Sequence, residues 1–269
     1  MLKRLVDFCI RWLAARVEAV DINRVWIQQN KVCKTRRWWG WVLILIGNPV
    51  LACRQVPVRV LFATQWIRWE REVKRAVNGE AISPGSVLVC NRLPGVPLAN
   101  WMTDSGETKD VRLEVLKIAM TSLQEFHRVE LDNGSADRIP LSHGDATLNN
   151  VLYDAENRSV QWIDFDLRHW LNVPAPQRHA DDLRAFLFSA VRHLPVAEIP
   201  EFLTAMQQQY DAPSVWSCLR SQLSSCWFRF DVFHRAHIRR SRNPKSSNEN
   251  LDSKWACLTK LIIAHTDQT

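Results

Sequence analysis

Three polar side chains between residues 141 and 166 have the types and spacing that phosphoryl transfer needs. His143-Gly144-Asp145 comes first, Asn150 follows Asp145 by five residues, and Asp164 follows it by nineteen. A phosphoryl group leaves a nucleotide through a loose transition state, so a protein mainly positions the groups and neutralises charge. A carboxylate can orient or deprotonate the attacking hydroxyl, and carboxylate and amide oxygens suit Mg²⁺. Asp145 fits the first role, and Asn150 and Asp164 fit the second.

The residues between these side chains predict how they meet. Two apolar runs, 151–153 and 160–163, flank the polar segment 154–158. This pattern is typical of a β-hairpin. The hairpin would place Asn150 just before its first strand and Asp164 at the end of its second, so that both lie at the same edge.

The stretch resembles the catalytic core of the kinase-like phosphotransferases. It is similar to the aminoglycoside phosphotransferase and choline kinase group and to the lipopolysaccharide (Kdo and heptose) kinases, which share His-Gly-Asp, an Asn five residues after the Asp, and an Ile-Asp-Phe metal motif. The resemblance implies that Asp145 is the catalytic base, that His143 braces the catalytic loop, and that Asn150 and Asp164 bind Mg²⁺ beside ATP. Asn149 has the wrong spacing for a ligand. The implied fold is α+β and two-lobed, with a reduced β-rich N-lobe and a mainly helical C-lobe.

Composition fits a globular protein of this size. The hydrophobic fraction is 46% and the charged fraction 23%, both ordinary values. The seven cysteines are scattered without a Cys-x-x-Cys pair, which favours reduced thiols in a cytoplasmic setting over zinc binding or disulfides. Residues 1–78 hold fifteen Lys and Arg against five Asp and Glu, a net charge of +10 within a chain of +7. This basic segment favours anionic partners and disfavours polycationic aminoglycosides.

We expect an N-lobe at 1–94 and a C-lobe at 95–269. Residues 2–20 have the periodicity of a basic amphipathic helix. They lack a signal peptide's uninterrupted apolar run. Residues 38–53 are the most apolar stretch, too short to span a membrane and interrupted by the turn signal Gly47-Asn48-Pro49. We expect this insertion to be buried in the N-lobe, with contact to a membrane surface as the alternative.

The nucleotide half of the site is predicted from the same resemblance. Two short strands are expected around 25–27 and 31–34, and a helix over 60–77. Lys34 resembles the strand lysine that binds the ATP phosphates, with Lys31 as the rival. Glu72 resembles the helix glutamate that pairs with this lysine, with Glu70 as the second choice.

Three further segments fit the family pattern. Leu93-Pro94-Gly95-Val96-Pro97-Leu98 resembles the hinge between the lobes. The helix predicted over 110–131 contains His127, which we interpret as structural. Asp182 resembles the aspartate that holds the catalytic loop backbone, although a helix N-terminus also favours an acidic residue for its dipole.

The sequence departs from the kinase-like pattern in two places, and both departures restrict the range of predicted functions. None of the eight glycines precedes Gly40, so the glycine-rich phosphate loop is missing. Only about sixteen residues separate Asp166 from Asp182, which disfavours a regulated protein kinase. The sequence therefore predicts an ATP- and Mg²⁺-dependent phosphotransferase acting on a hydroxyl of a small molecule or of a lipid or lipopolysaccharide sugar. It is expected in the cytoplasm, with possible peripheral contact at the inner face of an anionic membrane and no specific nucleic acid binding. The alternative is a pseudokinase acting as a binding or membrane-docking module.

Overall fold

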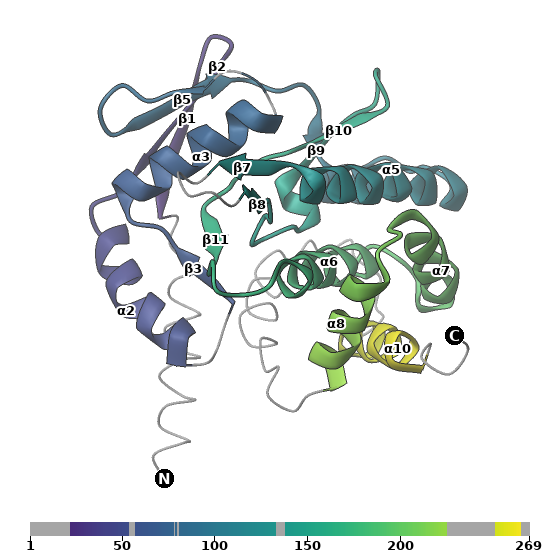
Figure 1. Cartoon of the computed structure of the whole chain (residues 1–269). Helices are drawn as coiled ribbons and strands as arrows, with labels where there is room; N and C mark the ends of the chain where they lie inside the picture. Colours follow the sequence, from purple (N-terminus) through teal and green to yellow (C-terminus); the bar gives the residue numbers. More distant parts are fainter. Residues whose placement is uncertain are drawn as a thin grey trace. The chain divides into compact units, whose positions relative to one another are not determined.

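The computed structural model describes residues 22–53, 57–77, 79, 81–132, 138–224 and 251–264 (Figure 1). It is a mixed α+β structure with antiparallel sheets towards the N-terminus and helices towards the C-terminus. Its contacts divide it into two compact units. Unit 1 holds the described residues up to Arg92 together with Asp166–Trp170, and unit 2 holds Leu93–Phe165 and the described residues from Leu171 onwards. The sequence placed the boundary near residue 94.

Unit 1 is built on a four-stranded antiparallel sheet in the order β1-β2-β5-β4. The predicted hairpin is present, with Val25 opposite Lys34. β2 lies between β1 and β5, and its side chains Cys33, Lys34 and Arg36 are buried. Lys34 is 7% exposed, whereas Lys31 at the strand start is exposed. The strands are β1 (Asn23–Gln28), β2 (Lys31–Arg36), β4 (Ala81–Ile82) and β5 (Val87–Asn91).

Helix α3 (Ala63–Val77) packs on this sheet through contacts with β4 and β5. Trp66, Trp69 and Val73 recur at helical spacing and are buried, as expected for one apolar face of an amphipathic helix. The prediction of a helix from residue 60 is wrong at its start. Residues Val58–Val60 form strand β3, which pairs with β11 (Leu167–His169).

Residues 38–53 differ most from expectation. Helix α2 (Gly40–Cys53) continues through the predicted turn at Gly47-Asn48-Pro49. The Asn48 side chain bonds both backbone groups of Val60, donating to its carbonyl oxygen at 2.9 Å and accepting from its N–H at 3.0 Å. The expected burial is also wrong for one face. Ile44 is buried, but Trp38 is 79% exposed and Leu45 is 61% exposed, because α2 contacts its unit mainly along β3.

Unit 2 contains the predicted catalytic hairpin. Strands β9 (Val151–Asp154) and β10 (Ser159–Trp162) pair antiparallel, with Val151 opposite Trp162, and β6 (Val96–Pro97) pairs on the other side of β9. Gly95 has a φ of 97°, and a Cβ there would lie 2.4 Å from the carbonyl oxygen of Tyr153. The hinge-like motif thus needs glycine where its backbone meets β9.

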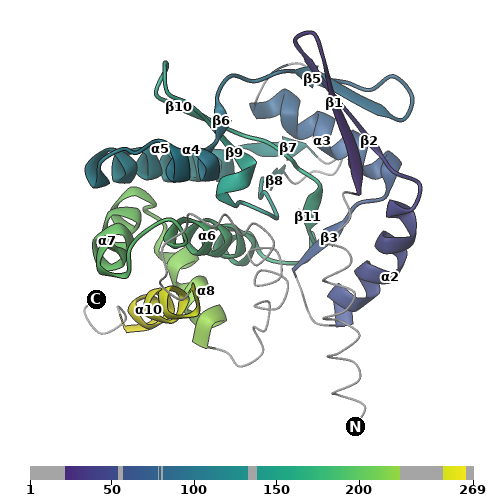
Figure 2. The ribbon, with the colours of Figure 1, turned by 180° about the vertical axis from the view of Figure 1, so that it is seen from behind.

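Helices make up most of the rest of unit 2, and Figure 2 shows α4 and α5 from the opposite side. Thr108 caps α5 by accepting a hydrogen bond from Val111 N–H, as N-cap residues do. Buried leucine, alanine and phenylalanine side chains of α5 and α6 supply much of the core. The remaining elements are α4 (Leu98–Asp104), α5 (Lys109–Arg128), β7 (Glu130–Asp132), β8 (Arg138–Pro140), η1 (Leu148–Asn150), α6 (Ala175–Val191), η2 (Val196–Glu198), α7 (Ile199–Gln209), α8 (Pro213–Ser224) and α10 (Leu251–Ala264).

The amphipathic helix predicted over residues 2–20 lies outside the described residues. Among the helices that the structure does describe, none combines the length and the apolar character that crossing a bilayer requires.

Candidate active site

Asp145 and Asn150 are held together in unit 2. The side-chain amide of Asn150 donates to the Asp145 carboxylate at 2.9 Å and to the Asp145 backbone carbonyl at 2.9 Å. Asn150 is 8% exposed and Asp145 is half-buried, whereas Asn149 is exposed. The amide thus fixes the orientation of a carboxylate that is still open to a reactant.

His143 connects the loop of Asp145 to the end of β10. Its Nε2 lies 2.9 Å from the carbonyl oxygen of Ile163, and its Nδ1 accepts from the N–H of Asp145 at 3.3 Å. These partners require the hydrogen on Nε2 of the neutral ring. Burial lowers the pKa of His143, which keeps the ring neutral. The geometry is that of a brace rather than of a proton-transferring group.

The end of the hairpin presents Asp164 beside Asn150. The N–H of Ile163 donates to the Asn150 carbonyl oxygen at 2.9 Å, so the strands keep these positions at one edge, as the sequence predicted. Asp164 has a φ of 65°. A residue other than glycine held in this left-handed region costs on the order of 1–3 kcal/mol, and such strain concentrates at functional sites.

Asp182 on α6 anchors the loop that contains His143 and Gly144. Its carboxylate accepts from the N–H of His143 at 2.6 Å and from the N–H of Gly144 at 2.7 Å. It is fully buried, and its Oδ2 also lies 3.0 Å from Nε2 of His127. The neighbouring Asp181 instead pairs with Arg184, so Asp182 is the residue that makes the contact implied by the resemblance.

His127 belongs to a buried stack beneath the loop, as its structural interpretation predicted. Its Nδ1 lies 2.6 Å from the hydroxyl of Tyr210, and its ring stacks on that of His179 at 4.0 Å between centroids. His179 Nε2 lies 2.8 Å from the carbonyl oxygen of Leu141, just before the loop. Burial, reinforced by repulsion from His127, lowers the pKa of His179 to about 3.

We expect acid to destabilise the fold through this stack. The folded pKa of His179 lies below the value of 6.5 for an unhindered histidine. Between these pH values the unfolded chain binds more protons than the folded chain. The contribution of His179 to the free energy of unfolding is therefore fully present above about pH 6.5. It is lost as the pH falls towards 3, by about 1.4 kcal/mol per pH unit. Urea unfolding between pH 7.5 and 5 measures this slope. His179→Gln keeps a hydrogen-bond donor for the carbonyl oxygen of Leu141. It should reduce the slope of the unfolding free energy against pH by an amount that corresponds to the uptake of up to one proton. An unchanged slope in that variant would contradict the assignment.

Lys34 in unit 1 pairs with Glu70 rather than with the predicted Glu72. Its Nζ lies 3.2 Å from Glu70 Oε2 and 2.7 Å from Asp166 Oδ1. Glu70 is 2% exposed and accepts from the indole of Trp66 at 2.6 Å, whereas Glu72 is exposed. The phase of α3 explains the correction. Glu70 follows Trp66 by one helical turn on the buried face, and Glu72 lies two residues, or about 200°, further round.

Asp166 is the site residue that the sequence analysis missed. The carboxylate of Asp166 contacts Lys34, Arg36 and Asn23. Arg36 also donates to the Leu61 carbonyl oxygen at 3.0 Å and lies over the Trp66 ring.

The residues fit a nucleotide-bound Mg²⁺ by the chemistry of their donors. Both hydrogen bonds of the Asn150 amide nitrogen go to Asp145, so its Oδ1 is the atom left for a cation. With a carboxylate oxygen of Asp164, it forms the hard oxygen donor set that Mg²⁺ prefers. No group of three His, Cys, Asp or Glu side chains suited to a metal occurs among the residues that the structure describes.

Comparisons with known proteins add little beyond this geometry. No family model matches the chain, and no curated protein matches it. One solved structure with some likeness is described as a medium-resolution structure of the bifunctional kinase-methyltransferase WbdD. The match has 15% sequence identity and a TM-score of 0.33, and it covers 90% of this chain. The chain spans about half, 47%, of that protein's length.

Proposed function

We propose that this chain is an ATP- and Mg²⁺-dependent phosphotransferase of kinase-like fold that transfers the γ-phosphate to a hydroxyl group. The observation that supports it best is the anchored loop of unit 2. Asp182 fixes the backbone at His143 and Gly144, and the Asn150 amide fixes the carboxylate of Asp145. A rigidly oriented carboxylate next to an amide and an acid of metal-binding type is what in-line phosphoryl transfer requires.

The proposed roles follow from these contacts. Asp145 accepts the hydrogen of the acceptor hydroxyl and aligns its oxygen for attack. His143 keeps the loop aligned with the strand end that presents Asp164. Asn150 and Asp164 would bind Mg²⁺, which neutralises the phosphate charge when bound. Lys34, positioned by Glu70 and Asp166, would bind the ATP phosphates.

The acceptor is proposed to be a small molecule or a lipid-linked or lipopolysaccharide sugar. Residues 1–78 have a net charge of +10, from fifteen basic and five acidic residues. A segment with this net charge favours phosphorylated or acidic acceptors over polycations. A neutral or anionic sugar hydroxyl therefore suits the chain better than an aminoglycoside does.

Helix α2 supports peripheral contact with the inner face of an anionic membrane. Its residues include no charge, and it exposes Trp41, Val42 and Leu45 next to the exposed Trp38 and Arg37. Tryptophan and arginine at the border of an apolar surface favour the lipid headgroup region. In sedimentation with anionic vesicles, Leu45→Gln combined with Trp38→Gln should reduce the bound fraction. Equal sedimentation of variant and native protein would exclude this face as the contact.

A pseudokinase remains the second candidate, and one observation favours it. The ammonium group of Lys34 forms ion pairs with both Asp166 and Glu70, and no glycine-rich loop precedes this lysine in the sequence. A nucleotide would have to share the lysine with two carboxylates. The intact set of Asp145, Asn150 and Asp164 favours the enzyme.

The deciding experiment measures Mg²⁺-dependent ATP binding and hydrolysis by the purified protein. We expect a Mg²⁺-dependent signal that Asp164→Ala abolishes, because that variant loses a charged metal ligand. Asp110→Asn is the matched control, since Asp110 is an exposed carboxylate at the start of α5. A native protein without any Mg²⁺-dependent nucleotide signal would favour the pseudokinase. A signal that persists in Asp164→Ala would exclude the metal assignment.

A further inference from the structure

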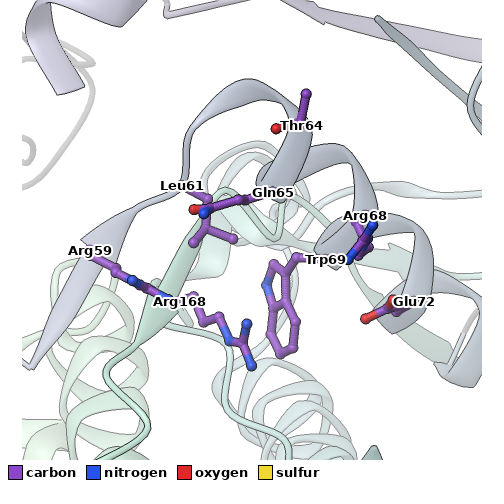
Figure 3. A pocket seen from close by; sticks show the side chains of 8 residues that line it. All are labelled: Arg59, Leu61, Thr64, Gln65, Arg68, Trp69, Glu72 and Arg168. Carbon is purple, nitrogen blue, oxygen red and sulfur yellow. The ribbon is translucent and has the colours of Figure 1, made fainter. Parts of the chain in front are cut away.

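A pocket of about 300 Å³ lies in unit 1 between α3 and the pair β3–β11 (Figure 3). None of the residues proposed for catalysis or for nucleotide and metal binding lines this pocket. Glu72, which does line it, was predicted to pair with Lys34, but Glu70 makes that contact. Its charged groups are three arginines and one glutamate, a net charge of +2. The lining residues are Arg59, Leu61, Thr64, Gln65, Arg68, Trp69, Glu72 and Arg168.

Two of the arginines stand directly opposite each other. Arg59 on β3 and Arg168 on β11 are cross-strand partners in the antiparallel register. Like charges in that position destabilise a strand pair. Both line the same pocket, and an anion between them would convert this repulsion into attraction.

Aromatic rings support the guanidinium groups. The Arg168 guanidinium lies over the ring of Trp69, 4.3 Å from its centroid, and Figure 3 shows the two side chains next to each other. The Arg59 guanidinium lies 4.7 Å from the centroid of Trp170. Stacking of this kind holds the planar cation in one orientation. A guanidinium held in this way can bind phosphate through paired hydrogen bonds.

The first turn of α3 supplies hydrogen-bond donors to the pocket as well. Thr64 and Gln65 belong to the first turn of α3, which contains no acidic residue. The backbone N–H groups of a first turn have no partner within the helix and attract anions. Trp69 is 7% exposed, and its buried Nε1 has no hydrogen-bond partner; neither has the buried Nε of Arg59. Two donors at the pocket therefore lack an acceptor.

We propose that this pocket is a phosphate-binding site, distinct from the nucleotide site, that takes inorganic phosphate or a phosphomonoester. Planar cations, a helix N-terminus and buried donors converge on one cavity, and the single carboxylate, Glu72, is exposed. The proposal does not depend on catalysis, because all its residues lie in unit 1 and none is a proposed ligand of Mg²⁺ or ATP. The strand that contains Arg168 begins one residue after Asp166, which contacts Lys34.

Calorimetric titration at low ionic strength tests the proposal. Inorganic phosphate, glucose 6-phosphate and glucose are titrated into the full chain, with and without saturating Mg²⁺ and a non-hydrolysable ATP analogue. Both phosphates should bind in either condition, and glucose should not. Tighter binding of glucose 6-phosphate than of phosphate would identify a phosphomonoester as the preferred source, and the reverse order would identify the free ion.

Charge variants locate the binding. Arg68→Gln and Arg168→Gln should each weaken phosphate binding about tenfold, the effect of one lost charge-assisted hydrogen bond. Arg75→Gln removes the same charge from an exposed position on the same helix, outside the pocket, and should change affinity less than twofold. Equal losses of affinity in all three variants would show that phosphate responds only to the overall charge of the protein, and would overturn the site. Phosphate binding that the ATP analogue abolishes would also overturn it.

Thermal unfolding provides a second readout. Phosphate should raise the melting temperature of the native protein, because a ligand stabilises the state that binds it. Arg59→Gln removes the opposed charge and should melt no earlier than the native protein without phosphate, while losing the phosphate-dependent rise. A rise that persists in this variant would overturn the role of the Arg59–Arg168 pair. Loss of nucleotide binding alone would count against the proposed function and leave these phosphate measurements valid.

Discussion

Asp145→Asn is expected to lower the rate of phosphoryl transfer by about two to four orders of magnitude, the usual contribution of a positioned general base. The asparagine side chain has the same shape but cannot accept the hydroxyl hydrogen as a carboxylate does. The Asn150 amide donates to the Asp145 carboxylate at 2.9 Å, and the variant keeps an oxygen for this bond. Initial rates at saturating Mg²⁺ and ATP measure the loss, while the KM for ATP should change little.

The neighbouring asparagines provide the matched comparison. Asn150→Ala removes the amide that orients Asp145 and provides the proposed oxygen ligand, so it should lower the rate and raise the Mg²⁺ concentration needed for half-maximal activity. Asn149→Ala removes an exposed side chain one residue earlier and should behave as the native protein. If Asn149→Ala lost as much activity as Asn150→Ala, the register of the proposed site would be wrong.

The part of the site in unit 2 could be predicted because its signals are local. Short apolar runs on either side of residues 154–158 specify a hairpin, and the hairpin register alone puts Asn150 and Asp164 at one edge. The choice of Asp182 came from the family resemblance. Its two hydrogen bonds to the loop connect segments nearly forty residues apart, a contact that only the family resemblance implied.

The part in unit 1 was less predictable because it depends on packing between distant segments. Glu70 and Glu72 are equally plausible by type, and only the buried phase set by Trp66 and Val73 separates them. That phase was readable in the sequence. The contact of Asp166 with Lys34 was not, because it joins positions 132 residues apart. Helix α2 shows another limit, since an uncharged sequence does not reveal which of its faces the protein covers.

Asp182→Ala is expected to cause the largest loss of stability, about 3–5 kcal/mol, the usual effect of removing one partner from a buried charged network. The carboxylate is completely buried and accepts from two loop N–H groups. Its removal leaves both donors without this acceptor, and a buried group in that state costs about 1–3 kcal/mol. Urea unfolding at pH 7.5 measures the change.

Asp182→Asn separates the two contributions of this residue if the alanine variant does not fold. Asparagine keeps one acceptor oxygen, so it should cost less stability than alanine. Its amide hydrogens would face the second loop N–H, so the loop should still shift and the transfer rate should fall with that shift. Asp110→Asn, an exposed carboxylate, should change stability by no more than about 0.5 kcal/mol. An Asp182→Asn variant as stable and active as Asp110→Asn would show that the loop does not need its anchor. The position of Asp145 would then have to come from the Asn150 amide and the His143 brace alone.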